Sequence, residues 1–321
     1  MYYMSMADSG SSGQLPACSD ARVSAIFAAA TRIWESRADL RSGYGSVTNP
    51  EFWIWLAWHG LDEYESLRAS WFEVPPPHLL ERCSGADAAP RSFVRRGAVD
   101  WRRCVQGLER CGVAAETAKL IEVGISCARV LRYFGRYAAT GTFTGLEIDP
   151  DGAAWCREQL SFARFLQVKP AGPCGLREGA FDAVIVPELF QRLVPAAQLA
   201  WIDEAARLLR PGGALVATYL GARVVERWTA GEAPGGSPKP EDLQEELPRL
   251  REEGSLYFIS KPFESAHPEN AQWARREDAS ELGTTFLTRE YVERAWTRSF
   301  DVVEILEAPD GWQDYAVLRR R

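Results

Sequence analysis

Two acidic residues frame the stretch of this chain that is best suited to hold a ligand. Glu122 lies in a short apolar run, Lys119–Ile125, and Gly124 follows it closely. Glu147 closes a second apolar run, Thr142–Ile148, 23 positions after that glycine. A carboxylate at this spacing can accept hydrogen bonds from the hydroxyl groups of a ribose. The pattern therefore predicts a nucleotide-type site.

The segment between the two acids predicts the elements that position them. Apolar residues recur at helical spacing over Cys127–Tyr137, and the flanking apolar runs are typical of strands. Strand, tight turn, helix and strand make a βαβ unit, which binds its ligand at the carboxyl ends of the strands. A dinucleotide would need two further glycines, because its pyrophosphate must touch bare backbone. The chain has Ser126 and Ala128 there, so the dinucleotide interpretation is poor.

This stretch resembles the class I S-adenosylmethionine-dependent methyltransferases. Their first motif is typically acidic-x-Gly-x-Gly-x-Gly, and their second strand ends in an acid. Glu122 and Gly124 match the first motif, and Glu147 matches the acid. Ser126 and Ala128 replace two of the glycines, so the glycine motif is degenerate.

Further motifs of the same family follow along the chain. Phe181–Val186 looks like the family's F-D-x-V fourth strand, and an amphipathic helix is predicted over Pro195–Arg210. The residues Pro211–Gly213 should end that helix and start a fifth strand, 214–220. Two closing strands, 301–306 and 315–319, fit the antiparallel end hairpin of these enzymes. The resemblance implies an α/β fold with a seven-stranded doubly wound sheet.

The rest of the chain predicts a tail, a cap and a lid. Residues 1–20 are predicted to form a disordered tail, and residues 21–115 a helical cap rich in aromatic residues. Within the cap, a loop is predicted over 85–97 and a helix over 101–111. Residues 116–321 form the predicted cofactor-binding domain. Its insertion, 221–287, contains an acidic helix that Pro248 should interrupt, and a hairpin strand near 255–260. The insertion is either a substrate lid or a plain surface excursion.

Composition narrows the classes of partner. The chain has 321 residues, of which 46% are hydrophobic and 25% charged, which is ordinary for a globular protein. A net charge of −7 argues against a nucleic-acid substrate. No apolar run reaches the length of a membrane span, which predicts no membrane partner. Seven scattered cysteines without a C-x-x-C pair predict no metal site and a cytoplasmic location. The oligomeric state stays open.

The resemblance also implies which residues bind the cofactor, S-adenosyl-L-methionine. They are Glu122, Gly124, Ile125, Ser126, Ala128, Arg129, Glu147, Ile148, Pro187, Glu188 and Leu189. Arg129 could instead pair with a neighbouring acid.

Methyl transfer needs a general base only when the acceptor must lose a proton. Glu188, after the fourth strand, and His59 and Tyr64, in the aromatic cap, are the candidate catalytic residues. Trp53 and Trp58 are candidate substrate residues, because aromatic faces attract a cationic sulfur. Their rings could equally pack the cap, and His59 could simply end a helix. Arg192 could hold a substrate carboxylate or be solvated surface.

These observations predict a methyltransferase that acts on a small molecule. One alternative keeps the cofactor but not the reaction, for example an enzyme that cyclises the aminobutyrate arm of S-adenosylmethionine. Another is a non-catalytic protein of the same fold, suggested by the replaced glycines. The retained acids Glu122 and Glu147 argue mildly against it.

Overall fold

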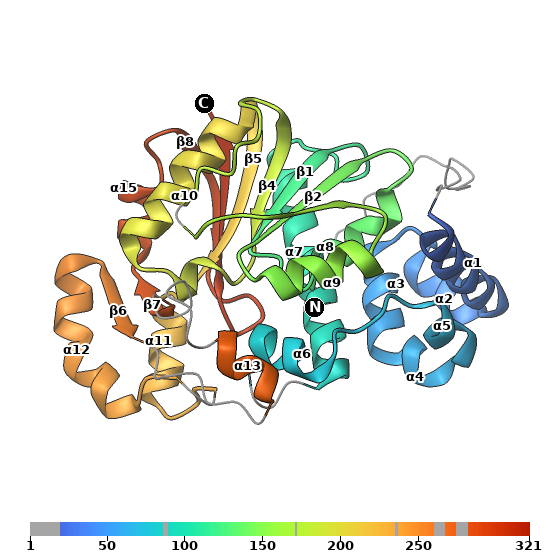
Figure 1. Ribbon diagram of the computed structural model, residues 1–321, viewed down its shortest axis with the longest axis horizontal. Helices are drawn as coiled ribbons and strands as arrows, with labels where there is room; N and C mark the ends of the chain where they lie inside the picture. The colour runs from blue at the N-terminus through green and yellow to red at the C-terminus, as the bar shows by residue number, and fades with distance from the viewer. Residues whose placement is uncertain (1–19, 86–88, 171, 235–236, 260–266, 274–281) are drawn as a thin grey trace. The chain divides into compact units, whose positions relative to one another are not determined.

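The computed structural model, shown in Figure 1, describes residues 20–85, 89–170, 172–234, 237–259, 267–273 and 282–321. The chain divides into two compact units, the first ending at Trp71 and the second beginning at Phe72. The predicted disordered tail lies outside the described residues, except for Asp20. Helices 77–84 and 90–110, which fall within the predicted cap, belong to the second unit.

Helices make up the N-terminal unit. They are α1 (Ala21–Ser36), α2 (Ala38–Tyr44), α3 (Pro50–Trp55), the π-helical turn η1 (Leu56–Gly60), α4 (Leu61–Glu63) and α5 (Glu65–Ser70). The Asp20 carboxylate caps α1 by accepting hydrogen bonds from two backbone N–H groups of its first turn. Trp53 is buried, with its ring 4.8 Å from that of Phe27 and 6.1 Å from that of Trp71.

The second unit is built on a seven-stranded sheet with the order β3-β2-β1-β4-β5-β9-β8. Its strands are β1 (Lys119–Val123), β2 (Thr142–Glu147), β3 (Arg164–Gln167), β4 (Phe181–Val186), β5 (Leu209–Tyr219), β8 (Phe300–Leu306) and β9 (Asp314–Arg320). The first five are parallel, whereas β9 is antiparallel to both β5 and β8. The predicted doubly wound sheet with an antiparallel end hairpin is confirmed.

Helices and short helical turns connect these strands. They are α6 (Pro77–Ser84), α7 (Pro90–Arg110), α8 (Leu131–Phe134), η2 (Gly135–Tyr137), α9 (Pro150–Gln159), η3 (Phe190–Arg192), α10 (Pro195–Leu208) and α15 (Arg289–Ala295). Helix α7 packs against β5, β8 and β9, and α10 packs against β4 and β5. A Cβ at Gly107 would lie 2.8 Å from the Val216 side chain, so this glycine lets α7 approach the sheet closely.

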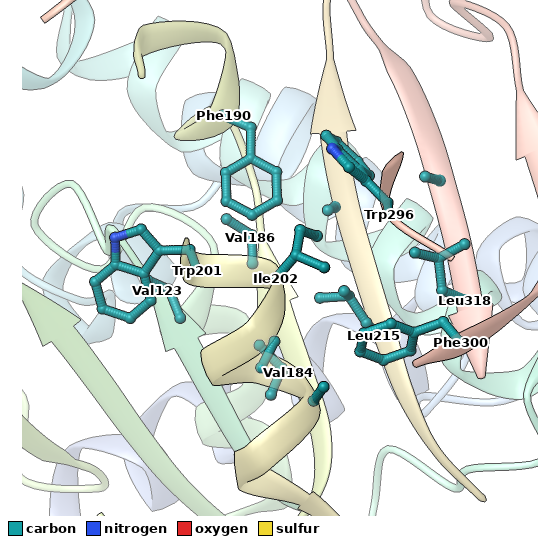
Figure 2. Close-up of a cluster of buried hydrophobic side chains, with 14 of the residues drawn as sticks. Val123, Val184, Val186, Phe190, Trp201, Ile202, Leu215, Trp296, Phe300 and Leu318 are labelled. Carbon is teal, nitrogen blue, oxygen red and sulfur yellow. The ribbon is translucent and has the colours of Figure 1, made fainter. Parts of the chain in front are cut away.

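The main core lies between the sheet and α10, η3 and α15 (Figure 2). Val184 and Val186 of β4 face Ile202 of α10, while the rings of Phe190 and Trp296 meet edge to face at 5.1 Å. Because β4 is covered on both faces, its sequence is a nearly continuous apolar run.

The insertion forms a small layer with a core of its own. It consists of α11 (Ala222–Thr229), α12 (Pro240–Glu253), β6 (Ser255–Ile259), α13 (Pro268–Trp273) and β7 (Gly283–Leu287). The predicted hairpin strand pairs antiparallel with β7. The prediction that Pro248 interrupts the acidic helix was wrong, because α12 continues through it. Leu243 and Leu250, on either side of the proline, are buried and hold both halves of the helix on this core.

Two helix boundaries also differ from the prediction. Helix α10 ends at Leu208, so the motif Pro211–Gly213 lies within β5 and does not end the helix. A Cβ at Gly213 would lie 2.9 Å from the Arg210 carbonyl oxygen, which explains why a glycine stands there. Helix α7 begins at Pro90, inside the predicted loop, with proline in its first turn where the missing N–H is harmless.

Candidate functional site

The order of strands changes direction between β1 and β4, and this is where open α/β sheets bind their ligands. Strands β1, β2 and β4 are parallel neighbours, so the loops that follow them meet at one edge of the sheet. The residues predicted from the sequence to bind the cofactor all lie in these loops or at the ends of these strands.

The loop after β1 is a left-handed turn. Gly124 has φ +72°, and the next non-glycine residues at positive φ are Ser126, Cys127 and Ala128, at 43°, 56° and 55°. This conformation strains an L-residue, and glycine would adopt it freely. The helix predicted from Cys127 therefore begins only at Leu131, and that prediction was wrong at its N-terminal end. The two positions that lack the family's glycines are among the strained ones.

Glu147 is held by the backbone of the surrounding loops. Its Oε2 accepts a hydrogen bond from Ser126 N at 3.0 Å, and its Oε1 accepts from Ile148 N at 2.8 Å and Asp149 N at 3.1 Å. Burial raises the pKa of this carboxyl to about 7, although the N–H groups oppose the shift. A carboxylate has about four acceptor positions, so one position on Oε2 is left for a ligand hydroxyl.

Glu122, at the end of β1, is only 1% exposed, and its Oε2 has no hydrogen-bond partner among the described residues. Burial raises the pKa of this carboxyl well above its ordinary value, although the charge of Arg129 opposes the shift. A buried oxygen without a partner is costly, and a donor from a ligand would relieve that cost.

Arg129 connects a buried acid, Asp100, with a half-buried one, Glu188. Its guanidinium is 2.5 Å from Asp100 of α7 and 2.9 Å from Glu188, which follows β4. Asp100 also accepts a hydrogen bond from the Tyr315 hydroxyl at 2.6 Å. A Cβ at Gly97 would lie only 2.2 Å from the Arg129 carbonyl oxygen, so this glycine lets α7 lie directly on the loop. Arg129 pairs with neighbouring acids, one of the two interpretations drawn from the sequence.

Glu188 has φ +60°, and its N–H donates to Thr218 Oγ1 at 2.7 Å. Its carboxylate also lies 2.5 Å from Arg96. Burial alone would raise the pKa of Glu188, but the positive charges of Arg129, Arg96 and Arg192 outweigh burial and lower it. Such a carboxylate is ionised at neutral pH but is only a weak base.

The remaining predicted cofactor residues line the same loops. Ile125 and Ala128 are fully buried, while Ser126 and Ile148 are half-buried. Leu189 packs on Gly124, where an added Cβ would lie 3.0 Å from the Leu189 side chain. Pro187 is buried at the end of β4.

The candidates in the N-terminal unit are described within that unit alone. The Trp53 indole N–H donates to the Val47 carbonyl at 2.9 Å, which is the arrangement of a core residue. Trp58 is 39% exposed, His59 is exposed beside Trp55, and the Tyr64 hydroxyl accepts from Arg37 at 3.0 Å. Their roles in catalysis or substrate binding stay predictions.

Three residues of this edge were not predicted from the sequence. Arg96 and Asp100 lie on α7, near or within a predicted loop, and Trp312 lies in the turn before β9. Gly97, between the two α7 residues, was the available signal, because a glycine within a helix often marks close packing. Nothing in the sequence around Trp312 indicated a site.

In the part of the chain that the structure describes, no cluster of three or more His, Cys, Asp or Glu residues could hold a metal ion. Among the same residues, no helix has both the length and the apolar character needed to cross a membrane.

Residues 121–217, which run from β1 into β5, match a family model described as a methyltransferase domain. This part of the chain is similar to a methyltransferase domain. Its strand order and antiparallel end hairpin are those of the class I fold. The protein is accordingly a transferase.

Solved structures with a similar arrangement include a protein of Pyrococcus horikoshii OT3, with 16% identity and a TM-score of 0.44 over 72% of this chain and 95% of that chain. An S-adenosylmethionine-dependent methyltransferase from Mesorhizobium loti has 12% identity and a TM-score of 0.45. The match covers 70% of this chain and 99% of that chain. The 1,6-didemethyltoxoflavin-N1-methyltransferase of Burkholderia thailandensis has 14% identity and a TM-score of 0.41. The match covers 77% of this chain and 92% of that chain. Similarities this low say nothing about the acceptor of this domain.

The residues of the edge fit the cofactor. Glu147 offers an acceptor to a ribose hydroxyl, and the buried Oε2 of Glu122 lacks a donor. Ser126 and Ala128 replace glycines with small side chains, and that of Ala128 is turned into the protein. The strain of their backbone is the feature that distinguishes this loop from a glycine-rich one.

Proposed function

We propose that this protein transfers a methyl group from S-adenosylmethionine to a small molecule. The observation that carries the proposal is Glu147, a buried carboxylate at the end of β2 that keeps one acceptor free, within a span that matches a methyltransferase domain. In this proposal Glu147 holds the ribose, and the loop from Gly124 to Arg129 passes beneath the rest of the cofactor.

A small acceptor is supported by the way the chain covers its own ligand-binding edge. Arg82 of α6 donates to both carboxylate oxygens of Asp149, at 3.0 and 2.8 Å, just after Glu147. The same guanidinium donates to Asn270 of α13 at 2.5 Å, and Asn270 donates to Glu81 at 2.7 Å. These bonds attach a helix of the insertion beside the proposed ribose position, as the place of α13 next to α6 in Figure 1 illustrates.

The contacts of α13 therefore support the interpretation of the insertion as a lid. The Arg82 side chain is 4% exposed, and charge-assisted hydrogen bonds between buried partners resist opening more than exposed ones do. A lid that closes on this edge would exclude water from the reacting groups. It would also leave little room for a macromolecular acceptor.

The bound cofactor would supply a methyl group already activated by a positively charged sulfur. The contribution of the protein is then to align the acceptor and to keep the site dry. Glu188 is poorly suited as a general base, because the adjacent guanidinium groups lower its pKa. Its proposed role is to hold Arg96 and Arg129 in place, while His59 and Tyr64 remain the alternative candidates for proton transfer.

Product analysis tests this function. The protein is incubated with S-adenosylmethionine and a library of small-molecule acceptors, and the nucleoside products are separated by chromatography. Methyl transfer yields S-adenosylhomocysteine only when an acceptor is present. Cyclisation of the aminobutyrate arm would instead yield 5′-methylthioadenosine without any acceptor. A non-catalytic protein would yield neither, and that result would overturn the proposal.

A further inference from the structure

A tryptophan and several arginines lie at the ligand-binding edge, away from β2. Trp312, in the turn between β8 and β9, is 48% exposed. The guanidinium carbons of Arg96 and Arg227 lie 5.8 and 5.3 Å from the centre of its ring. Strand β9 begins at Asp314, opposite Tyr219 at the end of β5, so this turn is at the carboxyl edge of the parallel strands.

Three arginines act on Glu188. Arg96 and Arg129 both form ion pairs with this acid, and the charge of Arg192 also acts on it. Arg129 has a second partner in Asp100. The exposed side chain of Arg192, in η3 directly after β4, forms no hydrogen bond or ion pair with any residue in the described ranges.

We propose that Arg192 and Arg96 bind a carboxylate of the methyl acceptor, and that Trp312 packs against a planar ring of the same molecule. This inference rests on the proposed function and names its substrate class. A guanidinium group binds a carboxylate through two parallel hydrogen bonds, and the half-exposed indole offers an apolar face. An anion at this place would pair with Arg192, whose side chain has no ion-pair partner among the described residues.

The cofactor also has a carboxylate, which is the competing source of the same chemistry. The sheet order separates the ring-binding residue from the ribose, because four strand-to-strand steps lie between β2 and β9, whereas Arg192 follows β4, two steps from β2. At about 4.8 Å a step, the turn that contains Trp312 lies roughly 19 Å from the strand that carries Glu147. Trp312 thus belongs to the side of the edge away from the ribose.

A pair of matched probes tests the inference. Binding of 4-hydroxybenzoate and of the neutral 4-hydroxybenzamide is measured by calorimetry on protein saturated with S-adenosylhomocysteine. We expect the acid to bind about tenfold more tightly than the amide, with Arg192→Gln removing most of that difference. Trp312→Ala should weaken both probes. Arg210→Gln is the control, because Arg210 pairs with Asp182 at the opposite edge of the sheet.

The inference is overturned if the acid has no advantage, if neither probe binds, or if Arg192→Gln behaves like the control. It also fails if Arg192→Gln weakens S-adenosylhomocysteine but not 5′-methylthioadenosine, because the carboxylate would then be that of the cofactor. The proposed function fails separately, when wild-type protein does not bind S-adenosylhomocysteine at all.

Discussion

The buried carboxylate of Glu147 should make the binding of a ribose depend on pH. This side chain is 8% exposed, and burial raises its pKa to about 7 from an ordinary value of 4.5. The difference corresponds to about 3 kcal/mol, because one pH unit represents about 1.4 kcal/mol. A ribose hydroxyl donates to the ionised carboxylate, so binding favours the charged form.

The sign of the effect on folding is opposite to the sign of the effect on binding. An unfolded glutamate ionises near pH 4.5, whereas Glu147 in the folded protein ionises near pH 7. Between these values the folded state holds more protons, so this residue contributes most stability at low pH and loses it as the pH rises to 7. Ribose binding should instead become stronger as the pH rises. The ionised fraction increases from about one tenth at pH 6 to about nine tenths at pH 8, which predicts about tenfold tighter binding.

Adenosine is the suitable ligand for the assay, because it carries the ribose hydroxyls but no group that titrates between pH 6 and 8. Its affinity is measured by calorimetry across that range, and 2′,3′-dideoxyadenosine serves as the control without the hydroxyls. Glu147→Ala should abolish the pH dependence and weaken S-adenosylmethionine by about 1.5–3 kcal/mol, the scale of charge-assisted hydrogen bonds. A folded variant with unchanged affinity, or a flat pH profile for the wild type, would refute the reasoning.

Other substitutions test the loop, the packing and the aromatic unit. Replacing Ser126 and Ala128 by Gly should raise thermal stability by about 1 kcal/mol per site and tighten S-adenosylmethionine, because both residues have positive φ; weaker binding would show that their side chains contact the cofactor. Gly97→Ala should lower the unfolding temperature strongly, since its Cβ would meet the Arg129 carbonyl, whereas Gly43→Ala, with open space around it, should not. Trp58→Leu should reduce turnover more than stability; an equal loss of both would make this ring structural.

The parallel part of the sheet could be predicted from the sequence because local signals determine it. A strand covered on both faces must be apolar throughout. The strand predicted over Phe181–Val186 begins and ends at the same residues as β4. The acids Glu122 and Glu147 marked the ends of β1 and β2, since ligands meet parallel strands at their carboxyl ends. The closing strands were recognisable from their own apolar patterns.

Local propensity failed where tertiary contacts opposed it. The run from Cys127 has helical spacing, but its first residues form a left-handed turn that directs Ser126 N to the Glu147 carboxylate. Pro248 lies inside α12 because packing of that helix on the insertion's core outweighs the cost of the proline. In each case an interaction between distant segments supplied the decisive free energy.

The sequence alone therefore determined the class of fold and predicted a position for a ribose, because both depend on patterns within single strands. Only the tertiary structure decided which charges meet. Gly97 is the one local signal beside Arg96 and Asp100, and nothing local separates Trp312 from solvated surface. The two charged residues and the tryptophan meet Arg129 or Glu188, or each other, because α7 lies on the loop after β1 and because β9 returns antiparallel beside β5. Contacts between segments so far apart in the chain leave little trace in its local pattern.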